Sequence, residues 1–108
     1  MDNVNSLIER EVSKLRSQGY TIRKPGKIVG ESGITHELDV IAEKEDEIIA
    51  ITSTLTEPII NMLIRLGLIK YDSKLDRVIL ITGRESTSEE KQIAESLGID
   101  IVAGNSYK

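Results

Sequence analysis

The spacing of hydrophobic positions changes along the chain from a helical period to a strand-like alternation. Gly19 is a typical helix stop, and the stretch before it, residues 4 to 18, predicts an amphipathic helix with one apolar stripe: Val4, Leu7, Ile8, Val12 and Leu15. "YTIRK" (20–24) then alternates like a short strand that ends at Pro25-Gly26. "KIVGESG" (27–33) indicates an irregular connection or a fraying strand.

A β-hairpin is predicted over residues 34 to 43 and 47 to 54, a segment that contains "HELDVIAEKEDEIIAITST". A turn centred on Glu45-Asp46 sets Lys44 opposite Glu47. By the same register, one face carries a polar set in which Asp39 opposes Thr52 and Glu37 opposes Thr54. The other face is apolar and is expected to pack on helices; it carries Leu38, Val40, Ala42, Ile49 and Ile51.

The second half of the chain alternates between helical and strand patterns. "TEPIINMLIRLGLIKY" predicts a helix with Pro58 in its first turn, and "DRVILIT" predicts a strand buried on both faces. "STSEEKQIAESLG" is a helix with a capping box from Thr87 and Glu90 and with Gly98 at its end, and "IDIVA" is a last strand. The predicted order, αβββαβαβ, describes one α/β domain over residues 1–108, a sandwich with a mixed sheet flanked by helices.

Composition removes several classes of site. There is no cysteine, and His36 is the only histidine, so disulfides and thiolate sites are excluded and a structural zinc site is not expected. The net charge of −4 argues against broad, unspecific DNA binding. Abundant Ile, Lys and Glu without Cys are compatible with a thermophilic source. No long apolar run and no secretory pattern at the N-terminus are found, so we expect a cytoplasmic protein without a membrane span.

Asp39 is the most informative single residue, because it stands between Leu38 and Val40 in an otherwise hydrophobic strand. An unpaired carboxylate is costly to bury, so this position needs a reason. One interpretation is a metal ligand or an acid at a phosphate site. The other is an ordinary solvated residue on the open face of a half-exposed hairpin.

The order of the motifs along the chain favours the functional interpretation of Asp39. Glu9-Arg10-Glu11 in the first helix is followed by "GITHELDVIAE", an apolar strand and a helix, and then by "DRVILITG", a helix and "GIDIV". This combination resembles the PD-(D/E)xK nuclease superfamily over nearly the whole chain, and archaeal Holliday-junction resolvases are its closest-looking branch. The resemblance implies a restriction-endonuclease-like fold and a DNA ligand, either branched or duplex.

The resemblance also implies a catalytic motif, and here the chain departs from it. Asp39 matches the Asp that opens the motif, and Glu9 matches an acid that some members contribute from the first helix. The acid and the lysine that close the motif fall on Thr52 and Thr54, so both are missing. Divalent cations need anionic oxygen ligands, and a neutral hydroxyl cannot replace a lysine ammonium beside developing charge. We therefore expect a catalytically degenerate protein that needs no cofactor.

An alternative hypothesis is that the protein has retained nuclease activity. Glu37, Asp39 and Glu9 would form a carboxylate cluster that binds Mg²⁺, with Asp39 and Glu37 as the metal ligands of a divergent endonuclease; Glu57 or Lys70 are further residues that relocation would bring in. His36 has two interpretations as well. It is a catalytic base beside the acids, or a partly buried histidine with a hydrogen-bond partner, placed opposite Leu55 on the face of Leu38.

The helix after Pro58 is apolar around its whole circumference, whereas a surface helix normally has a polar side. We expect it to form part of an isologous homodimer interface, as the resemblance to dimeric resolvases also implies. The residues assigned to that interface are Ile59, Met62, Leu63, Leu66 and Ile69.

Basic residues cluster before the hairpin and after the buried strand. As phosphate contacts they would form a nucleic-acid interface; otherwise they are a solvated charged surface. The candidates are Lys14, Arg23, Lys24, Lys27 and Arg84, with Arg16 near the first. The leading hypothesis is a homodimeric, non-catalytic nucleic-acid-binding or assembly module. A divergent nuclease and a purely structural protein–protein module are the other two.

Overall fold

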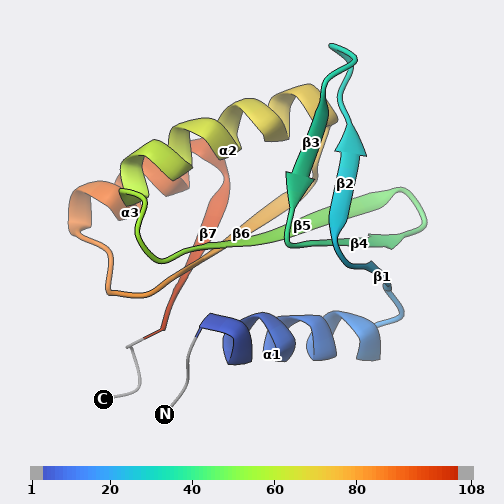
Figure 1. Ribbon diagram of the computed structural model, residues 1–108, viewed down its shortest axis with the longest axis horizontal. Helices are drawn as coiled ribbons and strands as arrows, with labels where there is room; N and C mark the ends of the chain where they lie inside the picture. The colour runs from blue at the N-terminus through green and yellow to red at the C-terminus, as the bar shows by residue number, and fades with distance from the viewer. Residues whose placement is uncertain (1–3, 105–108) are drawn as a thin grey trace.

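The computed structural model describes residues 4–104, which form three helices and seven strands (Figure 1). In chain order these elements are α1 (Val4–Ser17), β1 (Thr21–Arg23), β2 (Gly26–Val29), β3 (Thr35–Leu38), β4 (Val40–Lys44), β5 (Glu47–Thr54), α2 (Ile59–Ser73), β6 (Arg77–Thr82), α3 (Ser88–Leu97) and β7 (Ile99–Ala103). No helix within residues 4–104 has both the length and the apolar character that crossing a membrane requires.

Five strands form the main sheet, in the order β1-β4-β5-β6-β7. β1, β4 and β5 pair antiparallel, whereas β5, β6 and β7 run parallel because helices α2 and α3 cross between them. Helix α1 covers one face of the sheet, and α2 and α3 cover the other (Figure 1). The predicted α/β class and mixed sheet are confirmed. The predicted order is not, because five strands, and not three, lie between α1 and α2.

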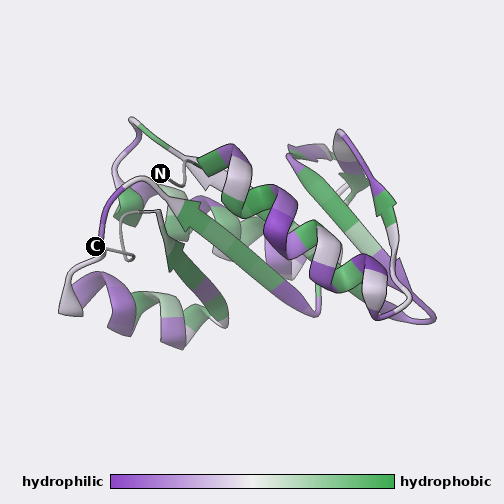
Figure 2. Cartoon of the chain, turned by 90° about the horizontal axis from the view of Figure 1, so that it is seen from below, coloured by the Kyte–Doolittle hydropathy of each residue, from purple (hydrophilic) through white to green (hydrophobic). Residues whose placement is uncertain are grey.

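Two hydrophobic cores lie on the two faces of the sheet. The stripe of α1 predicted from the sequence is buried against one face, where it meets Val40, Ala42, Ile49 and Ile51. Helices α2 and α3 close the second core, over Ile41, Ala50, Val78 and Leu80 on the other face. β6 is therefore buried on both sides, as its continuous apolar run predicted. In Figure 2 the main strands are green along most of their length, while α1 alternates between green and purple.

The predicted hairpin is correct at its turn and wrong at its open end. Lys44 pairs with Glu47, and the ladder of β4 with β5 runs back to the pair of Val40 with Ile51. There the first strand of the predicted hairpin is interrupted. β3, which ends at Leu38, lies outside the main sheet and pairs with β2 in a separate two-stranded sheet. Of the two interpretations of "KIVGESG", the strand is therefore confirmed for its first residues, which belong to β2. Leu38 accordingly packs in the core that α2 closes, whereas Val40, predicted to share its face, packs in the core under α1.

Gly26 explains how the second sheet can cross the first. It is buried at the start of β2, where a Cβ atom would lie 2.7 Å from the backbone of Val40 and from the backbone nitrogen of Ile41. Only glycine allows so close an approach between β2 and the edge of β4. The two-stranded sheet can then turn away from the main one, toward α2.

The predicted ends of α3 are confirmed. The Thr87 side chain accepts from the Glu90 amide, the Glu90 side chain accepts from the Thr87 amide, and Gly98 takes the left-handed conformation at the C-terminus. Helix α2 begins at Ile59, with Pro58 as its N-cap, and ends at Ser73, with Lys74 as its C-cap at a φ of 56°. Pro58 thus precedes the first turn in which it was predicted.

Helix α2 has a buried face and an exposed face, and apolar side chains lie on both. The five residues assigned from the sequence to a dimer interface, Ile59, Met62, Leu63, Leu66 and Ile69, are all buried in the core of the monomer. That assignment is wrong. The apolar side chains that α2 presents to solvent are Ile64, Leu68 and Tyr71, which are 55%, 68% and 84% exposed.

Candidate functional site

Asp39 lies at the point where β3 leaves the main sheet and β4 begins, beside the end of the antiparallel β5. Its side chain is exposed to solvent. The Ser53 hydroxyl donates to Asp39 Oδ2 at 2.9 Å, and the Thr52 hydroxyl lies 3.5 Å from the same oxygen. The pairing of Asp39 with Thr52 is therefore as predicted, but the closer partner is Ser53, which sequence reasoning missed. Alternation along β5 assigned Ser53 to the opposite face, and only the break before β4 brings it within reach.

Thr54, at the position where the resemblance noted above implies a lysine, is turned toward a different group. Its hydroxyl donates to the Glu57 carbonyl at 3.0 Å. Thr82, its neighbour in the register of β5 with β6, donates to the Arg84 carbonyl at 2.6 Å. Both threonines are buried and hold the loops that follow their strands. The hydroxyl-rich edge of the sheet is thus divided: Ser53 and Thr52 face Asp39, whereas Thr54 and Thr82 fix backbone.

The two other acids of the predicted cluster do not join Asp39. Glu37 faces Lys27 across β2 and β3, with the ammonium 3.5 Å from its carboxylate, and Glu9 forms an ion pair with Lys24. Glu37 also does not oppose Thr54, because β3 has left the sheet. Within residues 4–104 no three His, Asp or Glu side chains are gathered so that they could hold a metal ion. The predicted cluster of three carboxylates is therefore not formed in the described residues, and the metal site on Asp39 and Glu37 stays a prediction.

The predicted basic patch is largely neutralised by acids. Arg23 pairs with Glu43 at 3.1 Å and Lys14 with Glu11 at 3.5 Å, in addition to the pairs that Lys24 and Lys27 make. These are solvent-exposed pairs of modest strength. They nevertheless cancel the local positive potential that phosphate binding requires. Of the two interpretations, the geometry favours a solvated surface of mixed charge.

Arg84 is also engaged, more tightly than the others. Its guanidinium forms two hydrogen bonds to the Glu90 carboxylate, of 3.1 and 2.8 Å, and the Glu90 side chain is only 9% exposed. The Arg84 guanidinium, together with the Thr87 amide, lowers the pKa of Glu90 to about 2, although burial opposes that shift. The same carboxylate raises the pKa of Arg84. Arg84 therefore fixes the start of α3 and does not offer its charge to a ligand.

His36 follows the second of its two interpretations. It pairs with Ile28 and not with Leu55, and its Nε2 lies 2.8 Å from Asp72 Oδ2; the His36 side chain is 15% exposed. It is a partly buried histidine with a partner, as that interpretation predicted. Ser32 donates its hydroxyl to the same Asp72 oxygen, at 2.7 Å. Because the Ser32 hydroxyl is bound to the carboxylate and not to the imidazole, the three residues are not arranged as a nucleophile and its base.

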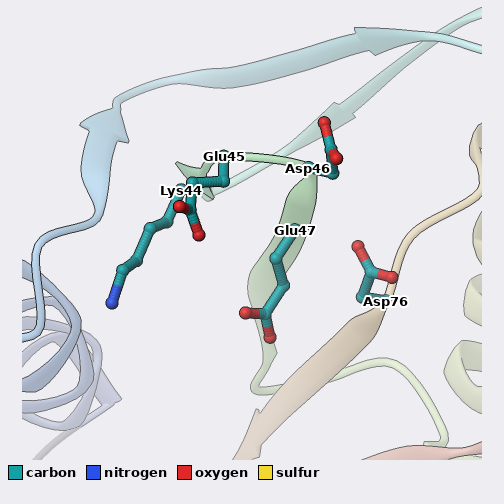
Figure 3. Close-up of a pocket in the computed structure, with 5 residues that line it drawn as sticks. All are labelled: Lys44, Glu45, Asp46, Glu47 and Asp76. Atoms are coloured by element: carbon teal, nitrogen blue, oxygen red, sulfur yellow. The ribbon is translucent and has the colours of Figure 1, made fainter.

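Asp39 does not line either of two surface hollows near strands β4 and β5. One, of about 550 Å³, surrounds the turn between β4 and β5, at the opposite end of these strands from Asp39 (Figure 3). In Figure 3 Lys44 points away from the acids that line it, which are Glu45, Asp46, Glu47 and Asp76. Glu47 accepts from the Tyr20 hydroxyl at 2.6 Å and Asp76 accepts from the Ile48 amide at 2.7 Å, so both have structural roles.

A smaller hollow of about 350 Å³ lies at the same edge of the sheet as Asp39, between the ends of β5 and β6 and the start of α2. Thr54, Thr82 and Arg84 line it, and all three are occupied by the interactions described above. The Thr54 and Thr82 hydroxyls and the Arg84 guanidinium at this hollow are therefore bound within the chain.

No protein-family model and no curated protein matches the chain. Two solved structures are similar to it. One is described as a protein of unknown function, AF1548, with 19% identity and a TM-score of 0.68; the other is protein VC1899 from Vibrio cholerae, with 17% identity and a TM-score of 0.69. The alignments cover 91% and 93% of this chain, but only 56% and 29% of those proteins, respectively. The fold described here thus spans just over half of one and under a third of the other.

Proposed function

We propose that the chain has a restriction-endonuclease-like fold whose catalytic motif has decayed, and that it acts as a non-catalytic assembly module. One observation carries this proposal: the carboxylate at the motif's first acidic position accepts hydrogen bonds from neutral hydroxyls, Ser53 and Thr52, where an active member would have an acid and a lysine nearby. Asp39 is then a remnant of a metal site whose other members have been replaced.

The chemistry of phosphodiester cleavage explains why such a site is inactive. A hard divalent cation needs several anionic or carbonyl oxygens, and a single exposed carboxylate binds it weakly. Without a lysine, no preorganised cation stabilises the charge that develops on the phosphate, and the loss of one such group costs about 100- to 1000-fold in rate. Glu37 and Glu9, the acids that would compensate, are held by lysines elsewhere.

Between nucleic-acid binding and assembly, the pairing of charges supports assembly. The five main candidates for phosphate contact each have an acidic partner, and the net charge is −4; these five are Lys14, Arg23, Lys24, Lys27 and Arg84. Binding to a phosphate backbone would have to break these pairs and overcome the net repulsion. A protein partner makes no such demand.

For the partner we propose a second copy of the chain, packed on the exposed face of α2. Ile64, Leu68 and Tyr71 recur at intervals of four and three residues, so they form one stripe two turns long. Two such helices packed antiparallel around a two-fold axis would bring Ile64 of each copy to Tyr71 of the other, with the two Leu68 side chains at the centre. This face replaces the buried residues to which the sequence assigned the interface.

Two experiments test the proposal. Purified protein is incubated with branched, single-stranded and duplex DNA in Mg²⁺ or Mn²⁺; we expect no cleavage, and cleavage that Asp39→Ala abolishes would overturn the loss of catalysis. Light scattering coupled to size-exclusion chromatography should give a dimer that Leu68→Glu converts to a monomer, with Glu89→Gln as a control on an exposed position of α3. A wild-type monomer at micromolar concentration would contradict assembly with itself, and binding to DNA that falls steeply with salt would favour the nucleic-acid role instead.

A further inference from the structure

The hairpin formed by β2 and β3, residues 26–38, is called here the arm. It pairs with no strand of the main sheet and rises from the sheet toward the end of α2 (Figure 1). Near its base, Leu38 and Ile28 pack on the core that α2 closes. Its tip lies outside this core, where Val29 and Ile34 are 64% and 59% exposed. Hydrophobic burial thus holds the base of the arm, and another interaction must hold the tip.

Asp72, in the last turn of α2, supplies that interaction. Its carboxylate accepts three hydrogen bonds from the arm: from the Ser32 amide at 2.9 Å, from the Ser32 hydroxyl at 2.7 Å, and from His36 Nε2 at 2.8 Å if that nitrogen carries the proton. Its backbone carbonyl accepts a fourth, from the Glu31 amide, at 2.9 Å. No other residue of α2 holds the arm through as many polar contacts in the part of the chain described, residues 4–104.

The backbone of the arm is shaped to receive this carboxylate. Gly30 is buried directly against it, and a Cβ atom at this position would overlap the Asp72 carboxyl group. Few charged groups lie near the contact between the arm and the Asp72 carboxylate in the described residues. His36 approaches from β3, and the Glu31 carboxylate lies 3.7 Å from the ammonium of Lys74, just past the end of α2. The His36 and Ser32 hydrogen bonds lower the pKa of Asp72, so the carboxylate is charged in this position.

His36, through which the arm contacts Asp72, lies on the same short segment of the chain as Asp39. His36 precedes Asp39 by three residues, and between them only Glu37 and Leu38 complete β3. The segment is therefore held at one end by Asp72 and at the other by the hydrogen bond of Ser53 to Asp39. A movement of the arm away from α2 must pull on Asp39, because three residues of extended chain span only about 10 Å.

From these observations we propose that Asp72 is a latch: it holds the arm docked on α2, and its release lets the arm move as a unit and displaces Asp39 from the Ser53 hydroxyl. This conformational device is independent of the proposed function, since it concerns the placement of Asp39 whether or not any partner binds. It divides the molecule into a main sheet with three helices and an arm hinged at Gly26 and Asp39, with Asp72 setting the balance between docked and released positions.

Hydrogen exchange of single amides, followed by NMR, tests the latch. The arm is reported by the Glu31 amide, which donates to the backbone carbonyl of Asp72, and the main sheet by the Leu80 amide in buried β6. Asp72→Ala keeps that carbonyl and removes only the carboxylate bonds to Ser32 and His36, so faster Glu31 exchange reports release of the arm. Hydrogen bonds to a charged group are worth enough to speed Glu31 exchange by about 10- to 100-fold in Asp72→Ala. Leu80 exchange should stay within about two-fold of wild type, because local opening leaves the core closed. The Ser53 and Asp39 chemical shifts should change in the same variant.

Asp76→Ala is the matched control, because Asp76 likewise accepts a backbone amide, that of Ile48, but lies outside the arm. It should leave Glu31 exchange unchanged. If Asp72→Ala does not fold, Ser32→Ala and Gly30→Ala replace it: the first removes one hydroxyl contact, and the second forces the arm off the carboxylate while keeping every polar group. Equal acceleration of Glu31 and Leu80, no acceleration of either, or unchanged Ser53 and Asp39 shifts would overturn the proposal.

Discussion

Ser53 donates a 2.9 Å hydrogen bond to the Asp39 carboxylate from the strand position between Thr52 and Thr54. The contact exists because β3 leaves the sheet just before Asp39, so the carboxylate reaches the end of β5 and not its face. A carboxylate held by hydroxyls keeps its hydrogen-bonding needs met without a cation. Under the proposed function, this is the arrangement expected where hydroxyls have replaced the partners of a metal-binding carboxylate.

A second carboxylate beside Asp39 should restore cation binding. Thr52 lies 3.5 Å from Asp39, so in Thr52→Glu we expect two carboxylates close enough to share Mn²⁺. Because Thr52 is mostly buried, the variant should be less stable than wild type without metal, by about 1–3 kcal/mol. Added Mn²⁺ should raise its melting temperature, since a ligand that binds only the folded state stabilises it. Thermal unfolding at several Mn²⁺ concentrations measures this.

Thr54→Glu is the control for the rise in melting temperature that Mn²⁺ should cause in Thr52→Glu. The Thr54 hydroxyl faces the Glu57 carbonyl and not Asp39, so a carboxylate there should not be rescued by Mn²⁺. An equal rise in melting temperature for both variants would show that binding is unspecific. No rise in either would mean that the position opposite Asp39 cannot complete a metal site.

The pair of Glu90 with Arg84 should make stability depend on acid pH. The pKa of Glu90 is lowered in the folded state to about 2, below its ordinary value of 4.5. The unfolded state therefore binds the proton first, and the stabilisation is complete above about pH 5 and is lost as the pH falls from 4.5 to 2. Since Arg84 is half exposed, we expect Glu90→Gln to cost about 1–2 kcal/mol at pH 7.

Urea unfolding at pH 7, 4 and 2.5 measures this dependence. The difference between wild type and Glu90→Gln should shrink steadily toward the lowest pH. Glu89→Gln, at the neighbouring exposed position in the first turn of α3, should differ little from wild type at every pH. A difference for Glu90→Gln that stays constant with pH would show that the ion pair is not its source.

Sequence patterns predicted those parts of the fold that local forces determine. The stripe of α1, the capping box of Thr87 with Glu90 and the apolar run of β6 each specify their element without reference to distant residues. The pattern could not locate the break at Asp39, because alternation of Leu38 and Val40 is the same whether one strand continues or two strands meet. Consequently Glu37 was assigned to the site, and Ser53 and the contact of His36 with Asp72 were missed.

The two apolar faces of α2 raised a related difficulty. A residue list cannot tell which side of an evenly apolar helix is buried, and the interface was assigned to the buried side. The structure predicts that substitutions at two nearby leucines have very different effects on the unfolding free energy. Leu66→Ala should cost about 2–5 kcal/mol in unfolding free energy because it opens a cavity, whereas Leu68→Ala should change the stability of the monomer by less than about 0.5 kcal/mol.

Chemical denaturation at low protein concentration compares these variants without interference from assembly. Similar losses for both leucines would mean that Leu68 is covered in the monomer. The helical propensity of leucine and alanine differs little, so any large effect at either position comes from packing.

Gly26 provides the last prediction, because it marks the crossing of the two sheets. An added Cβ would meet the backbone of Val40 and Ile41 at 2.7 Å, and backbone cannot move aside as the end of a flexible side chain can. We therefore expect Gly26→Ala to destabilise the protein by about 1–3 kcal/mol, the usual cost of overpacking. Gly67→Ala is a useful comparison: its Cβ would meet only the flexible Leu97 side chain, at 3.2 Å, and alanine favours the helix by about 1 kcal/mol. Its unfolding free energy should stay near that of wild type or rise. If Gly26→Ala were equally harmless, β2 would not need the close approach, and the arm would be free to leave the sheet at another residue.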